Sequence, residues 1–147
     1  MDDKSVKKVH LRVLTPTATK VDEAVDMVIM RCIGGDMGVL PGHETYVCVL
    51  DDGILRVLNR GRERRLAVFG GVAEVRDDVV TVLTEEAHWP GEIEKDRAEE
   101  TREHLRRKIQ EKTDDGELFR DQLLLRRTLL KIDLSDFPVD SEIDEDE

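Results

Sequence analysis

The sequence predicts an α+β chain in two parts, a flattened antiparallel β-sandwich followed by an antiparallel helical hairpin. Residues 9–84 contain short β-rich runs separated by turn residues, and residues 94–131 contain almost only good helix formers. A third segment, after Lys131, is acidic and is expected to be disordered. The predicted divisions are a sandwich domain, a helical hairpin domain and an acidic tail, at residues 1–88, 89–131 and 132–147.

Five runs in the first part have the composition of strands. They alternate apolar and polar residues or hold consecutive β-branched ones, at 11–13, 46–50, 55–57, 66–69 and 79–83. Asp52-Gly53 favours a hairpin between the second and third runs, because glycine accepts a positive φ. Asn59-Arg60-Gly61 and Asp77-Asp78 indicate further turns. Short strands at this spacing are typical of a sandwich or flattened barrel.

The character of the chain changes at Trp89-Pro90-Gly91, because proline disfavours helical geometry in the residue before it. One helix is predicted from Glu94 to Lys112 and a second from Glu117 to Lys131. The second helix has the larger apolar face, with Leu118, Phe119, Leu123, Leu124, Leu125, Leu129 and Leu130 against Ala98, Leu105 and Ile109 in the first. A hairpin buries part of that face, so the remainder must contact the sandwich or another protein.

Charge is distributed unevenly along the 147 residues, whose net charge is −11. The segment after Lys131 holds eight acidic residues and no Lys or Arg, which leaves 23 basic and 26 acidic residues in the rest. Nucleic-acid binding is therefore not expected, because it requires a basic face. No targeting or membrane-spanning segment is visible, and Cys32 and Cys48 lie in apolar runs as buried free thiols. We expect a soluble cytoplasmic chain.

The stretch Gly35 to Glu44, GDMGVLPGHE, raises the question of a phosphate-binding loop. Such a loop needs a lysine and a hydroxyl residue before a helix, and this stretch has neither. A plain turn and a contact surface both remain open, because the stretch keeps three apolar residues. The four histidines are scattered without metal-ligand spacing, and no nucleophile has a base near it in the sequence. The residues predict no metal site and no enzyme.

Several stretches, taken in order, resemble the epsilon subunit of the F-type ATP synthase. They are HLRVLTPT, GDMGVLPGHE, LDDGILRV and AVFGGVAEVRDDVVTVLTEEAHWPGEIEKDRAE, which together cover roughly residues 9–100. The resemblance implies a non-catalytic subunit of the rotating central stalk in a proton-translocating synthase, peripheral to the cytoplasmic face of the bacterial plasma membrane. The implied partners are the gamma subunit, the c-ring and, when the hairpin extends to block ATP hydrolysis, the alpha and beta subunits of the catalytic head.

The resemblance also implies two sets of site residues. The c-ring contact corresponds to Asp36, Met37, Val39, Leu40 and His43. The family's ATP-binding motif corresponds to Ile93, Glu94, Arg97 and Ala98, with glutamate where aspartate is expected. Arg126 and Arg127 (with Lys131) are further cations that suit phosphate. ATP is thus the one ligand implied, as a regulatory ligand.

Three alternatives follow from these observations. The chain is an interaction subunit with an inhibitory hairpin, an ATP-sensing regulatory module, or a β-sandwich adaptor unrelated to the motor. Two departures from the family concern the second part: the hairpin is crowded with charged residues, and the acidic tail has no expected counterpart. The tail is predicted either to hold the arginine-bearing helices down by charge attraction or to hinder insertion of the hairpin into the head.

Overall fold

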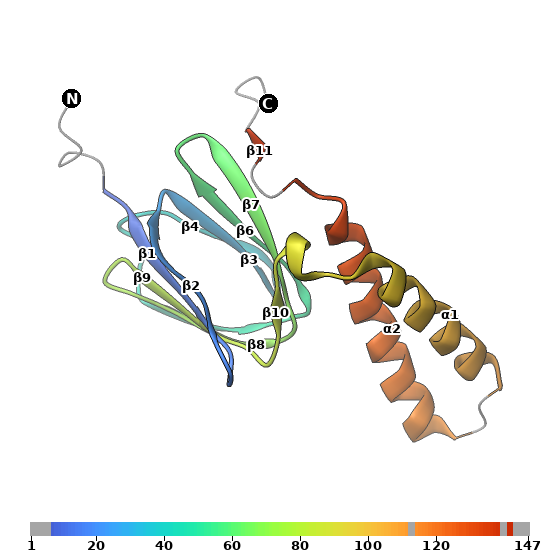
Figure 1. The fold of residues 1–147 in the computed structure, drawn as a ribbon. Helices are drawn as coiled ribbons and strands as arrows, with labels where there is room; N and C mark the ends of the chain where they lie inside the picture. Colours follow the sequence, from blue (N-terminus) through green and yellow to red (C-terminus); the bar gives the residue numbers. More distant parts are fainter. Residues whose placement is uncertain (1–6, 112–113, 139–140, 143–147) are drawn as a thin grey trace.

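The computed structural model describes residues 7–111, 114–138 and 141–142. Strands and helices follow one another in two groups, a β-sandwich and a pair of helices at one side of it (Figure 1). The elements are β1 Val9–Leu14, β2 Thr19–Val25, β3 Met27–Cys32, β4 Gly35–Val39, β5 Tyr46–Leu50, β6 Gly53–Asn59, β7 Arg62–Val68, β8 Gly71–Arg76, β9 Val79–Leu83, β10 Ala87–His88, η2 Pro90–Glu92, α1 Lys95–Glu111, α2 Asp115–Ser135 and β11 Ser141–Glu142.

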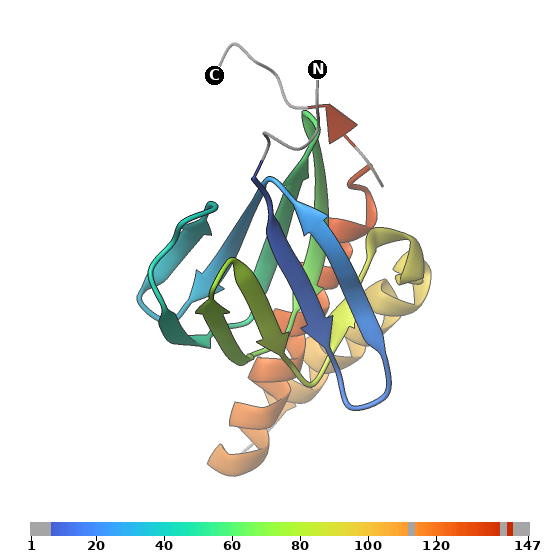
Figure 2. The same cartoon turned by 90° about the vertical axis from the view of Figure 1, so that its left-hand side faces the viewer.

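The strands form one hydrogen-bonded path that curls into the two layers of the sandwich (Figure 2). Its order is β10-β7-β6-β3-β5-β8-β9-β1-β2, with β4 paired to β3 and β11 paired to β7. The predicted fold class, a β-sandwich followed by two helices, is confirmed. One pair departs from the antiparallel expectation, because β1 and β9 run parallel.

The core is built by alternation along the strands. Val9, Leu11 and Val13 of β1 point inward and are fully buried, whereas Arg12 between them is exposed. Most other core positions are also valine or leucine, so nearly all of the core is aliphatic. Burial of aliphatic surface at roughly 25 cal/mol per Å² is the main stabilising contribution here.

Two of the three predicted turns join paired strands. Arg60 and Gly61 have φ of 55° and 73° between β6 and β7, and Asp77 and Asp78 have φ of 49° and 61° between β8 and β9. These left-handed pairs match the twist of an antiparallel hairpin.

The predicted hairpin at Asp52-Gly53 is wrong, because β5 and β6 do not pair with each other. β3 lies between them, and the Asp51 amide donates to the Arg31 carbonyl at 3.1 Å. The chain therefore crosses β3 at this turn instead of folding back on itself.

The glycine-rich stretch at 35–39 is a strand and not a loop. β4 pairs with β3 from Val28↔Val39 to Cys32↔Gly35. A Cβ atom at Gly38 would lie 2.6 Å from Cε of Met27, so the methionine side chain occupies the space that a larger residue would need. Glycine is needed at position 38 because the strand packs closely against Met27. The composition of the stretch 35–39 does not show this.

The helical hairpin differs from its prediction mainly at its end. The first helix was expected over 94–112 and is observed as α1, Lys95–Glu111, with Lys112 outside the described residues. The second extends beyond Lys131 to Ser135, and the Asp114 carboxylate caps its start by accepting from the Gly116 amide at 3.0 Å. Residues 132–135 of the predicted tail are thus helical, while 139–140 and 143–147 lie outside the described residues.

The extension is helical because its apolar residues pack on the sandwich. Leu134 is only 3% exposed and forms a small second core with Ala67 and Phe69, and Phe137 packs against the same cluster. The Arg65 guanidinium lies 4.3 Å from the centre of the Phe137 ring. The acidic composition of residues 132–138 predicted disorder, but Leu134 and Phe137 pack against the sandwich.

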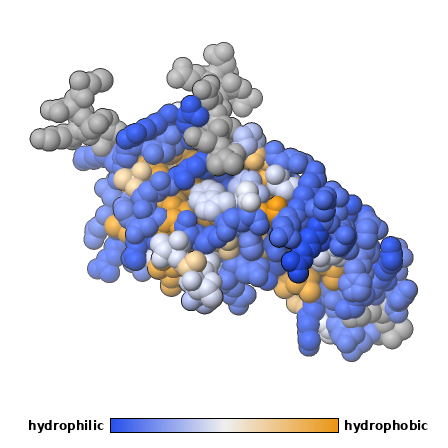
Figure 3. Space-filling model, viewed as in Figure 1, coloured by the Kyte–Doolittle hydropathy of each residue, from blue (hydrophilic) through white to orange (hydrophobic). Residues whose placement is uncertain are grey.

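The surface of the hairpin is mostly hydrophilic, with an apolar area toward its tip (Figure 3). Of the apolar excess predicted on α2, Leu130 packs on the sandwich, whereas Phe119 and Leu124 are 70% and 49% exposed. Within residues 7–111, 114–138 and 141–142, neither helix combines the length and apolar character that crossing a membrane requires.

Candidate functional site

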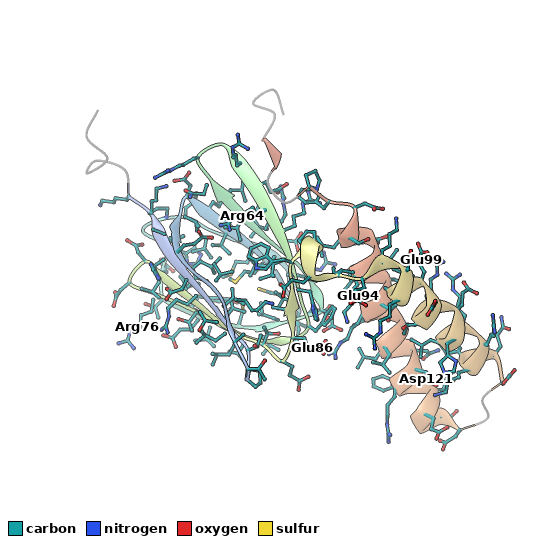
Figure 4. All side chains as sticks on the ribbon, viewed as in Figure 1. Arg64, Arg76, Glu86, Glu94, Glu99 and Asp121 are labelled. Atoms are coloured by element: carbon teal, nitrogen blue, oxygen red, sulfur yellow. The ribbon has the colours of Figure 1, made fainter. Side chains whose placement is uncertain are left out.

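A cleft of about 350 Å³ lies where the sandwich passes into the hairpin, and it contains most of the predicted nucleotide-site residues. Its walls come from the end of β10, η2, the first turns of α1 and the last half of α2. The residues that line it are His88, Glu92, Ile93, Glu94, Arg97, Ala98, Thr101, Thr128 and Lys131. Figure 4 shows Glu94 at the start of α1, beside α2.

Two cations and two hydroxyls are available in this cleft. Arg97 is 82% exposed along its side chain and lies 3.7 Å from the Glu94 carboxylate, a separation at which an exposed pair is weak. The Lys131 ammonium lies over the Phe69 ring at 5.5 Å. Thr101 and Thr128 donate their hydroxyl hydrogens to helix carbonyls one turn earlier, at 2.9 and 2.7 Å.

His88 provides the one polar atom of the cleft that is buried without a hydrogen bond. Its Nε2 lies 3.5 Å from the Glu86 carboxylate, outside hydrogen-bonding geometry. A bound polar group would satisfy this nitrogen. Together with Arg97 and Lys131, which suit phosphate, the cleft therefore fits a phosphorylated ligand in part.

The wall of the cleft at Glu92 is held by an ion pair with the far strand β2. Lys20 donates to both Glu92 carboxylate oxygens, at 2.7 and 2.6 Å, and the Trp89 amide donates to one of them at 3.0 Å. Burial opposes ionisation of Glu92, but these donors outweigh it and hold the pKa of the carboxyl below its usual 4.5. Glu92 therefore lines the cleft, but its carboxylate is already occupied by the bonds to Lys20 and Trp89.

The structure does not bring Arg126 and Arg127 to this cleft, which corrects the predicted set. Nε of Arg127 donates to Asp52 at 2.8 Å, and Arg126 lies 3.6 Å from Asp51. The Asp52 side chain is only 5% exposed, and its carboxylate raises the pKa of Arg127. The two arginines attach α2 to the turn between β5 and β6, and the cation that reaches the cleft is Lys131.

The five residues predicted to contact the c-ring do not form one tip. Asp36 lies near the start of β4, beside the β3–β4 turn, where it pairs with Arg31 at 3.3 Å. Leu40 and His43 follow the other end of that strand, roughly 13 Å away at 3.3 Å per residue. There the Gly42 amide donates to the Asp78 carboxylate at 2.7 Å, which ties this segment to the β8–β9 turn.

Burial separates these five residues further. Val39 is fully buried and is therefore a core residue, whereas Met37 is half-buried and packs against the core from its edge. Asp36 and Leu40 are exposed, with 54% exposure for Leu40, and His43 is half-buried. Asp36, Met37, Leu40 and His43 are accessible to a partner, and Val39 is not.

Sequence reasoning missed a row of exposed apolar residues on the outer face of the sandwich. Val49, Val72 and Leu83 are directly opposite one another across β5, β8 and β9, and they are 55%, 43% and 54% exposed. Val47 continues the row along β5 at 61%. We call these four residues the apolar row.

The signal for this row was present in the sequence. Val47, Val49 and Leu83 alternate with buried residues in runs that are apolar on both faces, which is unusual for a sheet with one face in water. The β3–β4 turn adds another exposed apolar residue, Ile33, at 70%. Contiguous exposed apolar surface of this kind marks a protein contact.

No cluster of three or more His, Cys, Asp or Glu side chains that could hold a metal ion occurs in the described part of the chain.

Comparison of the sequence with known proteins shows the family to which the chain belongs. The family of the ATP synthase delta/epsilon chain, β-sandwich domain, matches residues 8–90, more than half of the chain. Relatives named ATP synthase epsilon chain include that of Bacillus licheniformis, 32% identical over 88% of this chain and 99% of the relative, and that of Alkalihalophilus pseudofirmus, 36% identical over 74% and 81%. The chain therefore belongs to the ATP synthase delta/epsilon chain family.

Solved structures agree with this assignment. A chain of the Euglena gracilis mitochondrial ATP synthase, from the OSCP/F1/c-ring assembly, superposes with a TM-score of 0.73 at 28% identity, over 88% of this chain and 82% of that one. A chain of the Tetrahymena thermophila central stalk/c-ring assembly shares the fold at 11% identity, with a TM-score of 0.51.

Proposed function

We propose that this chain is a non-catalytic central-stalk subunit of a proton-translocating ATP synthase, which joins the gamma subunit to the c-ring at the cytoplasmic face of the membrane. The observation that carries the proposal is the apolar row, because a partner protein is needed to remove it from water. The family membership and the ATP synthase assemblies that contain the solved relatives support a rotor partner for this surface.

The gamma subunit is the proposed occupant of the apolar row. Val49→Glu or Val72→Glu places a charge in the middle of the row without touching the core, and should abolish co-purification with gamma. Ala24→Glu, on the exposed edge strand β2, is the matched control and should leave it unchanged. Retention of gamma by both row variants at wild-type levels would contradict the proposal.

The c-ring is the proposed partner of the β3–β4 turn. Asp36 and Ile33 there offer one exposed carboxylate and one exposed apolar side chain. Asp36→Arg reverses the charge at a site with no buried partner, so the fold should persist while ATP-driven proton pumping falls. Proton pumping equal to that of the wild type would remove Asp36 from the contact. Leu40→Asp tests the other end of β4 in the same assay.

The hairpin is proposed to inhibit ATP hydrolysis when it leaves the sandwich and enters the catalytic head. Its attachment includes the Arg127–Asp52 ion pair and the small core around Leu134 and Phe69, both of which can separate without unfolding the sandwich. Asp52→Asn should therefore release the hairpin and lower the ATPase rate of the reconstituted complex further than the wild-type chain does. An ATPase rate that is unchanged by this substitution would contradict the proposal that the hairpin does not inhibit while it is docked on the sandwich.

The C-terminal segment is proposed to favour the docked state, through apolar contacts, through charge or through both. Leu134 and Phe137 contact the sandwich through apolar groups, while most of the acidic residues follow later. Deletion of 139–147 removes six acidic residues together with the β11–β7 pairing, and deletion of 133–147 removes the apolar contacts as well. If charge attraction dominates, both deletions alter the ATPase rate and the effect of the shorter one disappears at high salt.

ATP sensing is the second candidate function, and the cleft beside Arg97 and Lys131 favours it. Arginine and lysine there would hold the phosphates, and the unsatisfied Nε2 of His88 would meet a polar group of the ligand. Calorimetry with ATP should show binding that Arg97→Ala weakens at least tenfold, whereas Arg126→Ala leaves it unchanged because Arg126 lies outside the cleft. Absence of heat at millimolar ATP would remove this candidate.

A further inference from the structure

The two cysteines of the chain lie side by side in the sandwich. The Sγ atoms of Cys32 on β3 and Cys48 on β5 are 3.0 Å apart, although the residues are 16 positions apart in sequence. Both are free thiols; Cys48 is buried, and Cys32 is half-buried and so reaches the surface. The sequence predicted buried free thiols but gave no reason to expect that they would meet.

The pairing of the strands explains the proximity. Cys32 stands directly opposite Leu50, so Cys48 is the diagonal neighbour on the same face of the sheet. The amide of Ile33 donates to the Val49 carbonyl at 3.1 Å, which fixes this register next to the cysteines. Gly34 and Gly35 lie two and three positions after Cys32, separated from it by Ile33. Glycine backbone there can absorb the approach of about 1 Å that an S–S bond of about 2.05 Å needs.

We propose that Cys32 and Cys48 are a redox pair that forms an intramolecular disulfide when the chain meets a small-molecule disulfide. The Cys32 thiolate attacks one sulfur of the small disulfide, forming a mixed disulfide and releasing one thiolate. The Cys48 thiolate then attacks the Cys32 sulfur and releases the second. Two protein thiols lose two electrons and two protons, and the small disulfide gains them as two thiols.

The environment makes this pair slow to react at neutral pH. Burial, the contact with the Cys48 thiol and the negative charge of Asp36 together raise the pKa of Cys32 to about 12. Asp36 on β4 and Cys48 on β5 are the titratable groups facing it. Because the thiolate is the nucleophile, the rate of the first step should rise about tenfold per pH unit between pH 7 and 9.

The bond would close a loop that contains all of β4. It would link the two residues that flank the segment 33–47, so fluctuations that separate β3 from β5 would be suppressed. We expect the midpoint of thermal unfolding to rise by roughly 5 °C in the oxidised chain. Backbone amides of 33–47 should exchange their hydrogens more slowly, while those of α1 and α2 remain unchanged.

The test is oxidation of the full chain by oxidised glutathione at pH 8.5, followed by intact mass measurement. The expected product is a monomer that has lost the mass of two hydrogen atoms and regains it with dithiothreitol. A chain that stops at the glutathione adduct, forms only intermolecular dimers or does not react would overturn the proposal.

Two variants assign the order of attack. Cys48→Ser should stop at the mixed disulfide on Cys32, and Cys32→Ser should remain unmodified because Cys48 is buried. Rapid modification of Cys48 in the folded Cys32→Ser chain would overturn the assigned order. If a serine variant fails to fold, the mass change of the wild-type chain still decides whether the pair forms.

Discussion

The sandwich and the hairpin bury their side chains in different ways. β1 alone places three fully buried aliphatic residues in the core, whereas the 17 residues of α1 bury only Ala98 and Leu105. On α2 the buried residues include Asp121 and Thr128, which are polar. Helices in proteins gain most of their stability from packing an apolar face, so the hairpin, with few buried apolar residues, is expected to be the less stable of the two regions.

The largest difference is expected from matched core truncations. Leu11→Ala removes a fully buried side chain from the sandwich and should lower the free energy of unfolding by about 3 kcal/mol. Leu105→Ala, at 4% exposure in the hairpin, should cost about half as much because the narrow interface between two helices can close around the gap. Chemical denaturation measures both, and equal losses would show that the hairpin is as tightly packed as the sandwich.

The next largest effect concerns the small core between the two regions. Leu134→Ala should destabilise docking of α2 by about 2 kcal/mol, since Leu134 is nearly fully buried against Phe69 and Ala67. Limited proteolysis should then cleave the hairpin sooner while the sandwich stays resistant. Leu124→Ala, at a position that is 49% exposed, is the control and should behave as the wild type.

A smaller effect is expected from the ion pair between the two regions. Asp52→Asn keeps the volume of the side chain but removes the charge that Arg127 contacts, and should cost about 1–2 kcal/mol of docking free energy. Hydrogen exchange of α2 should accelerate, with the strands unaffected. In a double-mutant cycle with Arg127→Met, a coupling energy near zero would show that the ion pair does not contribute to the free energy with which α2 docks on the sandwich.

The smallest effect is a pH dependence at the start of the hairpin. Because the folded pKa of Glu92 is lowered, its contribution is present above its usual pKa of 4.5 and is lost as pH falls through the folded value. The Lys20–Glu92 pair is partly exposed, so its contribution is under about 1 kcal/mol. Thermal unfolding between pH 3 and 6 should show a smaller acid loss in Glu92→Gln than in the wild type.

Sequence reasoning succeeded where a local pattern determined the structure. Alternation in 11–13 and the helix-forming composition of 94–112 each indicated one structure, and the structure agrees for β1 and for α1 over Lys95–Glu111. It failed at Asp52-Gly53 and Gly35–Val39, where a distant strand decides the outcome: β3 lies between β5 and β6, and Met27 fills the space over Gly38. Local propensity contains no information about either neighbour.

The candidate sites followed the same division. Ile93, Glu94, Arg97 and Ala98 line one cleft because they are close together in the sequence. Arg126 and Arg127 were assigned to it by charge alone, and they instead contact Asp51 and Asp52. The helical phase of α2 turns Lys131 to the cleft, and only the orientation of that helix on the sandwich could reveal this. The burial of Val39 likewise follows from strand pairing, because Val39 of β4 lies opposite the buried Val28 of β3.

One edge of β7 receives the chain twice, first as β10 opposite Ala67 and Val68, and later as β11 opposite Arg62 and Glu63. The whole hairpin is therefore an insertion whose entry and exit share one strand. The two pairings are separate, so loss of the β11 pairing would leave β10 on the sheet. Loss of that pairing would expose the edge of β7 at Arg62–Glu63, and an exposed strand edge is a site at which another strand can add to the sheet.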